Sequence, residues 1–283
     1  MPTALITGGS AGLGAAYAEH LAARGYDLVL VARDRARLDG VAERLRRKSG
    51  VAVEVIAADL TAAEHRAAVE GRLSDLSRPV DLLVNNAGVK CRDDFHVAPL
   101  PALVHEIDLN IVAVMALTRA ALSMMTARGE GAILNVASFA GYLSPAGSAY
   151  GATKAWMLAF TDSIAASLVG TGVRMLAVCP GRIRFSAHGA GADTNAVGSR
   201  SPLLVDAIEV VARSMADLER GRTLSTPGVA HRAVVAFLEA PRRALRVLAV
   251  AIGHCRRQRR RIGAVGTSGR RSQPADERPG HRS

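Results

Sequence analysis

Short apolar segments alternate with longer helical patterns along most of this chain. Near-continuous apolar strands are typical of a parallel sheet that helices cover on both faces. The pattern predicts a three-layer α/β/α fold with a doubly wound parallel sheet in a single domain. The predicted strands are Thr3–Thr7, Asp27–Ala32, Ala52–Ala57, Leu82–Asn85, Ala132–Ala137 and Val173–Cys179. The predicted helices between them are Gly12–Arg24, Ala36–Lys48, Ala62–Leu76, Leu100–Ala127 and Ser148–Leu168.

The first predicted strand leads into a glycine-rich turn with the spacing Gly8-x-x-x-Gly12-x-Gly14. Glycine permits positive φ and close backbone approach, and the following helix presents free N–H groups to an anion. No Lys-Ser or Lys-Thr pair follows Gly14, which disfavours the phosphate loop of nucleotide triphosphatases. The turn is therefore suited to a phosphate-bearing ligand, and the alternative is an ordinary strand-to-helix connection.

Tyr150, Lys154 and Ser138 have the spacing of a proton-transfer site. Tyr150 and Lys154 are four residues apart, so on a helix they lie on one face. A nearby positive charge favours the ionised phenol and brings its pKa closer to working pH. Ser138 ends an apolar strand, where its hydroxyl can hold a carbonyl oxygen while Tyr150 donates a proton.

The two motifs in this order resemble the short-chain dehydrogenase/reductase family over roughly residues 3–230. Further family landmarks are Asp59, Asn85-Asn86-Ala87-Gly88, Asn110 and Pro180-Gly181. The resemblance implies a Rossmann fold and an oxidoreductase of class EC 1.1.1 that transfers a hydride between NADP(H) and a carbonyl or alcohol. The stretches Asp27–Asp34 and Gly221–Gly228 are similar to bacterial ketoacyl-reductase-like members, which suggests an apolar or acyl-type ketone.

The family mechanism implies a role for each of four residues. Tyr150 is the general acid in reduction and the base in oxidation, and Ser138 orients the carbonyl. Lys154 lowers the pKa of the tyrosine and binds the nicotinamide ribose, while Asn110 holds a water that relays protons to Lys154. Taken singly, each residue also has a purely structural interpretation.

The resemblance also implies which residues bind the cofactor. Arg33 follows the second predicted strand, as in NADP-preferring members, and a guanidinium suits a phosphate. Asp34 stands twenty residues beyond Gly14, a distance typical of NAD-binding acids, and is otherwise the cap of the next helix. The sequence thus favours NADP(H) over NAD(H). The implied cofactor-binding residues are Gly8, Ser10, Gly12, Leu13, Gly14, Arg33, Asp59, Leu60, Asn86, Ala87, Gly88, Tyr150, Lys154, Pro180, Gly181 and Ile183.

The segment after Pro180-Gly181 departs from the family pattern. Members commonly have a threonine where this chain has Phe185, and that hydroxyl bonds the nicotinamide carboxamide. Here Ser186 or the Ile183 backbone can replace it. Residues 182–220 are small and polar enough for a substrate lid, with a disordered insertion as the alternative. A helix over Pro202–Arg220 and a strand near Thr223–Thr226 are predicted to close the catalytic domain, residues 1–228.

The net charge of +11 lies largely in the last thirty residues. His254–Ser283 has nine arginines and two acidic residues, a balance of +7. We predict a basic amphipathic helix over 229–253 and a disordered tail over 254–283. The tail has no nucleic-acid motif, so we expect no specific nucleic-acid partner and only weak contact with anionic surfaces.

Three scattered cysteines have no metal-like spacing, so no metal site or disulfide is predicted. The chain enters a strand at Thr3, and no uninterrupted apolar run approaches the roughly 18 residues of a membrane span. We therefore expect a cytoplasmic enzyme. Two broadly apolar helices, Leu100–Ala127 and Ser148–Leu168, match those that pair in homodimers or homotetramers of the family, although core burial is an alternative. The competing functions are a non-catalytic nucleotide sensor or scaffold and an NAD-dependent alcohol dehydrogenase.

Overall fold

The structure is a computed structural model that describes residues 1–144, 147–185, 204–229 and 231–239. It contains a compact unit, Met1–Ala236, and the first residues of a second unit, Phe237–Ser283. The structure describes residues 229 and 231–239 of the predicted helix over 229–253, and these are helical. Residues 240–253, the predicted tail over 254–283, Ser186 and the centre of the predicted lid lie outside the described residues. Those interpretations stay predictions.

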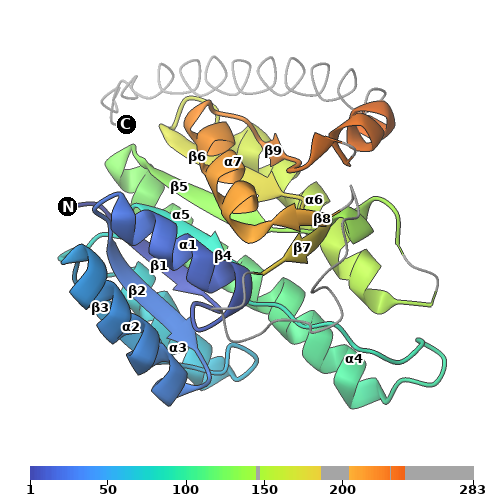
Figure 1. Cartoon of the computed structure of the whole chain (residues 1–283), viewed down its shortest axis with the longest axis horizontal. Helices are drawn as coiled ribbons and strands as arrows, with labels where there is room; N and C mark the ends of the chain where they lie inside the picture. Colours follow the sequence, from blue (N-terminus) through green and yellow to red (C-terminus); the bar gives the residue numbers. More distant parts are fainter. Residues whose placement is uncertain (145–146, 186–203, 230, 240–283) are drawn as a thin grey trace, which may run out of the picture. The chain divides into compact units, whose positions relative to one another are not determined.

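Seven parallel strands form the central sheet of the described chain, in the order β3-β2-β1-β4-β5-β6-β9 (Figure 1). Ile6 pairs with Leu30 on one side and with Val84 on the other. The carboxyl ends of all strands therefore meet at one edge, where ligands bind in open α/β sheets. The predicted Rossmann-like fold is confirmed. The strands are β1 Thr3–Thr7, β2 Asp27–Ala32, β3 Val53–Ala57, β4 Leu82–Asn85, β5 Gly131–Val136, β6 Val173–Val178 and β9 Leu224–Ser225.

Helices cover both faces of this sheet because successive strand side chains point in opposite directions. In β1, Ile6 packs in the core beneath α1, α2 and α7, whereas Leu5 packs in the core beneath α3 and α5. Figure 1 shows α1 and α2 side by side over the first of these faces. The helices are α1 Gly12–Ala23, α2 Arg35–Ser49, α3 Ala63–Leu73, α5 Val114–Arg128, α6 Ala149–Ser167 and α7 Ala207–Glu219.

The predicted helix Leu100–Ala127 is not a single α-helix. It consists of α4 Leu100–Ile107, a π-helical turn η1 Asp108–Ala113, and α5. The apolar period does not reveal such a turn, which is frequently found at functional sites. Within the run Leu100–Arg128, an 18-residue window has a mean hydropathy of 1.6, so the run is long and apolar enough to cross a membrane by length and composition, despite its scattered polar residues. In the structure, Leu117 and Met125 of α5 are buried against the sheet and α3.

The predicted helix Pro202–Arg220 begins later than the sequence indicates. Leu204–Asp206 forms a short strand, β8, that pairs in parallel with β7, Arg182–Arg184. Ile183 is opposite Val205, whose side chain is buried. This pairing joins segments far apart in the sequence, so tertiary contacts decide the conformation before α7 starts at Ala207.

Candidate active site

The glycine-rich turn is held against the end of β4 by a network around Thr7. The backbone N–H groups of Asn86 and Ala87 donate to Thr7 Oγ1 at 2.9 and 3.0 Å. Asn86 Nδ2 also donates to the Thr7 carbonyl at 2.9 Å. The segment Asn86-Ala87-Gly88 therefore lies next to the glycine-rich turn, as predicted, and its hydrogen bonds to Thr7 hold the turn in place.

Glycine is required in this turn for steric reasons. Gly8 has a φ of 68°, which side chains rarely adopt, and a Cβ there would stand 2.7 Å from Asn86 Nδ2. A Cβ at Gly14 would overlap the carbonyl of Gly8. Helix α1 starts at Gly12 without a side-chain cap, because its N-cap residue is Ala11. Its first N–H groups thus remain available to an anion at the turn.

Lys154 lies buried below the Tyr150 ring on α6. Its Nζ is 5.5 Å from the ring centroid and donates to the carbonyl of Val136 at the end of β5, at 2.8 Å. Only 3 % of Lys154 is exposed. This burial lowers the pKa of the ammonium to about 8. The i, i+4 pair predicted from the sequence is therefore present and faces the carboxyl edge of the sheet.

The pKa of Tyr150 differs from the sequence expectation. We expected the lysine charge to lower it, yet burial raises it above the ordinary tyrosine value. A hydrogen bond with Ser138 lowers it, but by less than burial raises it. The negative charge of Glu106 raises it further. In this environment Tyr150 keeps its proton at neutral pH.

Ser138 lies two residues beyond the end of β5 and is the N-cap of a short 3₁₀ helix, η2 Phe139–Gly141. Its Oγ accepts from the backbone N–H of Ala140 at 3.2 Å, and its hydroxyl is also hydrogen-bonded to Tyr150. The next residue, Phe139, donates its N–H to the Pro180 carbonyl at 2.9 Å. The two predicted landmarks Ser138 and Pro180-Gly181 are therefore adjacent.

Asn110 lies at the centre of the π-helical turn and is fully buried. Its Oδ1 accepts from the Val89 N–H at 3.0 Å, and its Nδ2 donates to the Val89 carbonyl at 2.8 Å. Nδ2 also donates to Thr153 Oγ1 at 3.1 Å, one residue before Lys154. The side chain therefore ties the segment after β4 to α6. Its implied water-relay role stays a prediction.

Sequence reasoning missed Glu106, one turn before Asn110. Its carboxylate is fully buried, and Oε2 accepts from the Cys91 N–H at 2.7 Å. An acidic residue within an apolar helix four positions before Asn110 was the available signal. His231 was missed as well, and it is buried edge-on to Phe139 with ring centroids 4.8 Å apart. Contact of His231 with Gly181 leaves no room there for any larger residue.

The adenosine end of the predicted cofactor site is more open. Arg33 is exposed and makes no hydrogen bond or ion pair within the described chain. Asp34 is the N-cap of α2 and accepts from the Arg37 N–H at 3.0 Å, as the capping interpretation predicts. Asp59 Oδ1 accepts from the N–H and the hydroxyl of Thr61 at 3.0 and 2.8 Å. The backbone N–H of Thr61, followed by its hydroxyl and the charge of Arg33, lowers the pKa of Asp59 despite the cost of burial.

The Phe185 side chain lies beside Gly12 of the glycine-rich turn, whereas the family pattern has at this position a threonine that bonds the nicotinamide carboxamide. Its ring carbons Cε1 and Cζ are 3.8 Å from where a Cβ at Gly12 would stand. The ring also packs against the core beneath α1 and α7. Phe185 therefore covers the glycine-rich turn with an apolar surface where the family pattern has a hydroxyl.

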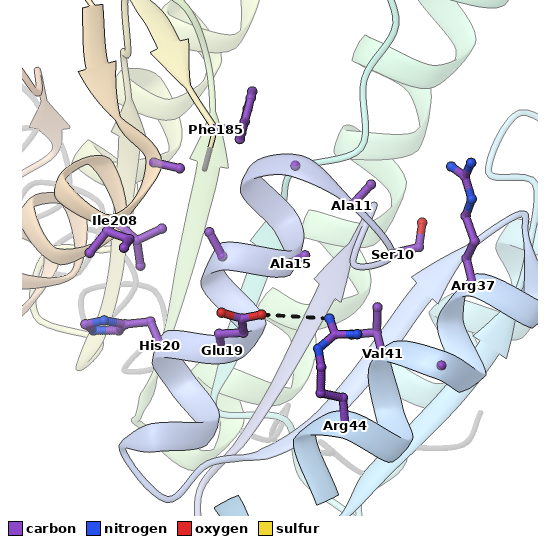
Figure 2. Close-up of a pocket in the computed structure, with 15 residues that line it drawn as sticks. Ser10, Ala11, Ala15, Glu19, His20, Arg37, Val41, Arg44, Phe185 and Ile208 are labelled. Atoms are coloured by element: carbon purple, nitrogen blue, oxygen red, sulfur yellow. Dashed lines mark ion pairs between the residues drawn. The ribbon is translucent and has the colours of Figure 1, made fainter. Parts of the chain in front are cut away.

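A cavity of about 490 Å³ lies beside this turn, between α1, α2 and α7 (Figure 2). Figure 2 shows Phe185 and Ile208 on one side and Ser10 and Arg37 on the other. Tyr150 and Lys154 are not among its lining residues, so the cavity extends from the glycine-rich turn and does not include this pair. Its described lining residues are Ser10, Ala11, Gly12, Ala15, Ala16, Glu19, His20, Arg37, Gly40, Val41, Arg44, Phe185, Ala207, Ile208 and Val211.

Comparisons with known proteins agree with this geometry. The family model described as short chain dehydrogenase matches residues 2–195. The ketoacyl reductase HetN of Nostoc sp. is 36 % identical over 182 residues, which cover 64 % of this chain and 63 % of HetN. The match thus spans less than two thirds of that relative's length.

Solved structures are similar over more of the chain. A short-chain dehydrogenase from Sphingobium yanoikuyae in complex with NADPH is 37 % identical, with a TM-score of 0.77 over 87 % of this chain and 95 % of its own. A bulky-bulky ketone specific alcohol dehydrogenase from Comamonas testosteroni is 33 % identical, with a TM-score of 0.77 over 87 % and 93 % of the two chains.

Proposed function

The chain belongs to the short-chain dehydrogenase family, and from that premise we propose that it interconverts carbonyl compounds and alcohols with NADP(H). The observation that carries the proposal is the grouping of Ser138, Tyr150 and Lys154 beside the glycine-rich turn. Ser138 hydrogen-bonds Tyr150, and Lys154 lies below the tyrosine ring. The three residues come from two elements whose ends meet at the carboxyl edge of the sheet.

The residues around the turn fit a dinucleotide. Gly8 and Gly14 leave space that any side chain would fill, and α1 presents uncapped N–H groups to a pyrophosphate. Arg33 offers an exposed cation to a 2′-phosphate, while Asp34 is engaged as a helix cap. This supports NADP(H) over NAD(H), as does the NADPH complex of the Sphingobium relative. When bound, NADP(H) supplies the hydride.

The chain's own residues handle the proton. In the reductive direction, Tyr150 donates its phenolic proton to the carbonyl oxygen, and in the oxidative direction it takes the proton back. The raised pKa of Tyr150 keeps the phenol protonated at neutral pH, which favours reduction. Ser138 donates its hydroxyl hydrogen to the same carbonyl oxygen, and the Lys154 ammonium stabilises negative charge that develops there.

We propose an apolar or acyl-type ketone as the substrate. HetN is a ketoacyl reductase, and the Comamonas enzyme is specific for bulky ketones. Apolar side chains near the site, among them Phe139, Tyr142 and Trp156, form a cluster with the end of β6. Such a surface suits a substrate with few polar groups.

Oxidation of NADPH by a panel of ketones, aldehydes and ketoacyl thioesters tests this function. We expect turnover of at least one apolar or acyl-type ketone with NADPH and weaker turnover with NADH. Tyr150→Phe is the matched inactive control. NADPH binding without turnover of any substrate would instead support a nucleotide sensor, and a preference for NADH would support an NAD-dependent alcohol dehydrogenase.

We also propose a homodimer or homotetramer. Leu100, Val104, Ile107 and Met115 lie three, four or eight residues apart along α4 to α5, and between 44 and 71 % of each is exposed. Isolated exposed apolar residues are common, but several of them gathered along α4 and the start of α5 suit an interface. Light scattering of the purified protein, with Ile107→Glu as the disrupting variant, measures the oligomeric state.

A further inference from the structure

Glu106 is a buried carboxylate to which the reaction as derived above assigns no role. None of its surface is exposed. Oε2 accepts from the Cys91 N–H at 2.7 Å, and Oε1 has no hydrogen-bond partner among the described residues. Burying a carboxylate is costly unless a positive charge or further hydrogen bonds compensate it. The buried carboxylate of Glu106 therefore requires a positive charge or a further hydrogen-bond donor nearby.

Glu106 and Asn110 both form hydrogen bonds with the backbone of residues 89–91. Asn110 bonds both backbone groups of Val89, and Glu106 bonds the N–H of Cys91 two residues later. The same segment begins with Gly88, where a Cβ would stand 3.5 Å from Lys154 Nζ. Asn110 also bonds Thr153, the neighbour of Lys154 on α6. The helix that carries Glu106 is thus tied to the lysine helix by two routes.

The charge of Glu106 also acts on both proton-handling residues. Its negative charge raises the pKa of Lys154 and of Tyr150, and Cys179, which follows β6, acts in the same direction when its thiol is ionised. Burial lowers the pKa of Lys154 and outweighs both contributions. The titratable groups that act on the lysine are therefore Glu106 from α4 and Cys179, with the Tyr150 ring facing it on its own helix.

We propose that Glu106 is a positioning residue of the reaction site, which fixes the Cys91 backbone with one oxygen and provides the counter-charge of Lys154. The inference rests on the proposed function, because it concerns the proton that this function requires. Glu106 does not contact the substrate. It acts through Lys154, whose ammonium it keeps protonated at a depth where burial favours the neutral amine.

Removing this charge has opposite consequences for the two reaction directions. Without Glu106 the pKa values of Lys154 and Tyr150 fall, because a negative charge that raised both is gone. Reduction needs the protonated site, so its alkaline limb moves to lower pH. Oxidation needs the deprotonated site, so its acidic limb also moves to lower pH and the reaction is faster at neutral pH. A merely structural defect slows both directions at every pH.

Glu106→Gln tests the proposal, since its amide oxygen can still accept from the Cys91 N–H while the charge is lost. In profiles of kcat/KM against pH, we expect both limbs to shift down by about one pH unit or more. Glu106→Asp retains the charge and should leave the limbs in place, although its shorter side chain lowers kcat. Glu70→Gln on α3 is the control for removal of a remote carboxylate and should change neither limb.

A second measurement does not depend on turnover. The chain has only Lys48, Lys90 and Lys154 as lysines, so NMR of lysine labelled at Cε can follow each titration, with Lys154→Met for assignment. Glu106→Gln should lower the Lys154 pKa below its wild-type value of about 8. An unchanged Lys154 titration, or limbs that stay in place while both rates drop, overturns the proposal. A wild-type protein that reduces no carbonyl refutes the proposed function alone, because the NMR titration still decides the role of Glu106.

Discussion

The reaction end and the adenosine end of the proposed cofactor site lie along the same edge of the sheet but differ in construction. At the reaction end, Asn110 and Lys154 are almost fully buried and bonded to backbone groups of other elements. At the adenosine end, Arg33 is exposed, and Asp34 and Asp59 bond groups within three residues of themselves.

This difference shows that the two ends of one site depend on different physical effects, burial at the reaction end and single exposed charges at the adenosine end. Burial shifts the pKa of Lys154 and Tyr150 in opposite directions, since it disfavours the charged form of each. Such shifts need the whole surrounding structure. At the exposed end, solvent screens single charges such as that of Arg33, so we expect individual substitutions there to have smaller effects.

Tyr150→Phe should have the largest effect and defines the reaction end. The change removes the transferable proton and retains the ring, so turnover should fall by roughly 10²- to 10⁴-fold. NADPH affinity, measured by fluorescence titration, should change little. Residual activity near the wild-type level would mean that another group donates the proton. The buried reaction end would then not be the source of the proton.

The pH dependence of reduction sharpens the comparison. The pKa of Lys154 is about 8, so the ammonium is present below that pH and is lost as the pH rises through it. Tyr150 keeps its proton over this range because its pKa is raised. We expect kcat/KM for reduction to decrease above pH about 8, by about tenfold per unit for loss of one proton. A flat profile up to the ordinary pKa of lysine would show that burial does not control this site.

Arg33→Ala probes the adenosine end. Loss of a charge-assisted contact with the 2′-phosphate should weaken NADPH binding by about tenfold or more and leave NADH nearly unaffected. Arg47→Ala, at the far end of α2, removes the same charge from an exposed position and is the matched control. Equal losses for both cofactors would make Arg33 structural and restore the NAD interpretation through Asp34.

Phe185→Thr tests the glycine-rich turn, which lies between the two ends, and should have the smallest effect. The substitution restores the hydroxyl of the family pattern but removes the ring that covers Gly12. A new hydrogen bond to the cofactor contributes about 0.5–1.5 kcal/mol, or a several-fold gain in affinity at most. Lost packing should lower Tm by a few degrees without cofactor, as measured by differential scanning calorimetry. An unchanged Tm would show that the ring does not stabilise the turn.

Much of the architecture was predictable because it depends on local pattern. Strands β1, β2 and β4 have the bounds that their apolar runs indicate. Asp34 is the helix cap that its residue type and position suggest. The glycine spacing and the Tyr150–Lys154 pair lie where the motifs require, because both depend on one turn and one helix.

The sequence by itself thus determined the layered fold, the place of the turn and the position of Tyr150 and Lys154 on one helix. Tertiary structure decided the π-helical turn around Asn110, the pairing of β7 with β8 and the position of Phe185 over Gly12. It also decided that burial raises the pKa of Tyr150 and that the charge of Glu106 raises the pKa of Lys154. These features depend on groups that are distant in the chain, and desolvation arises only when many elements pack around one site, so no local pattern encodes them.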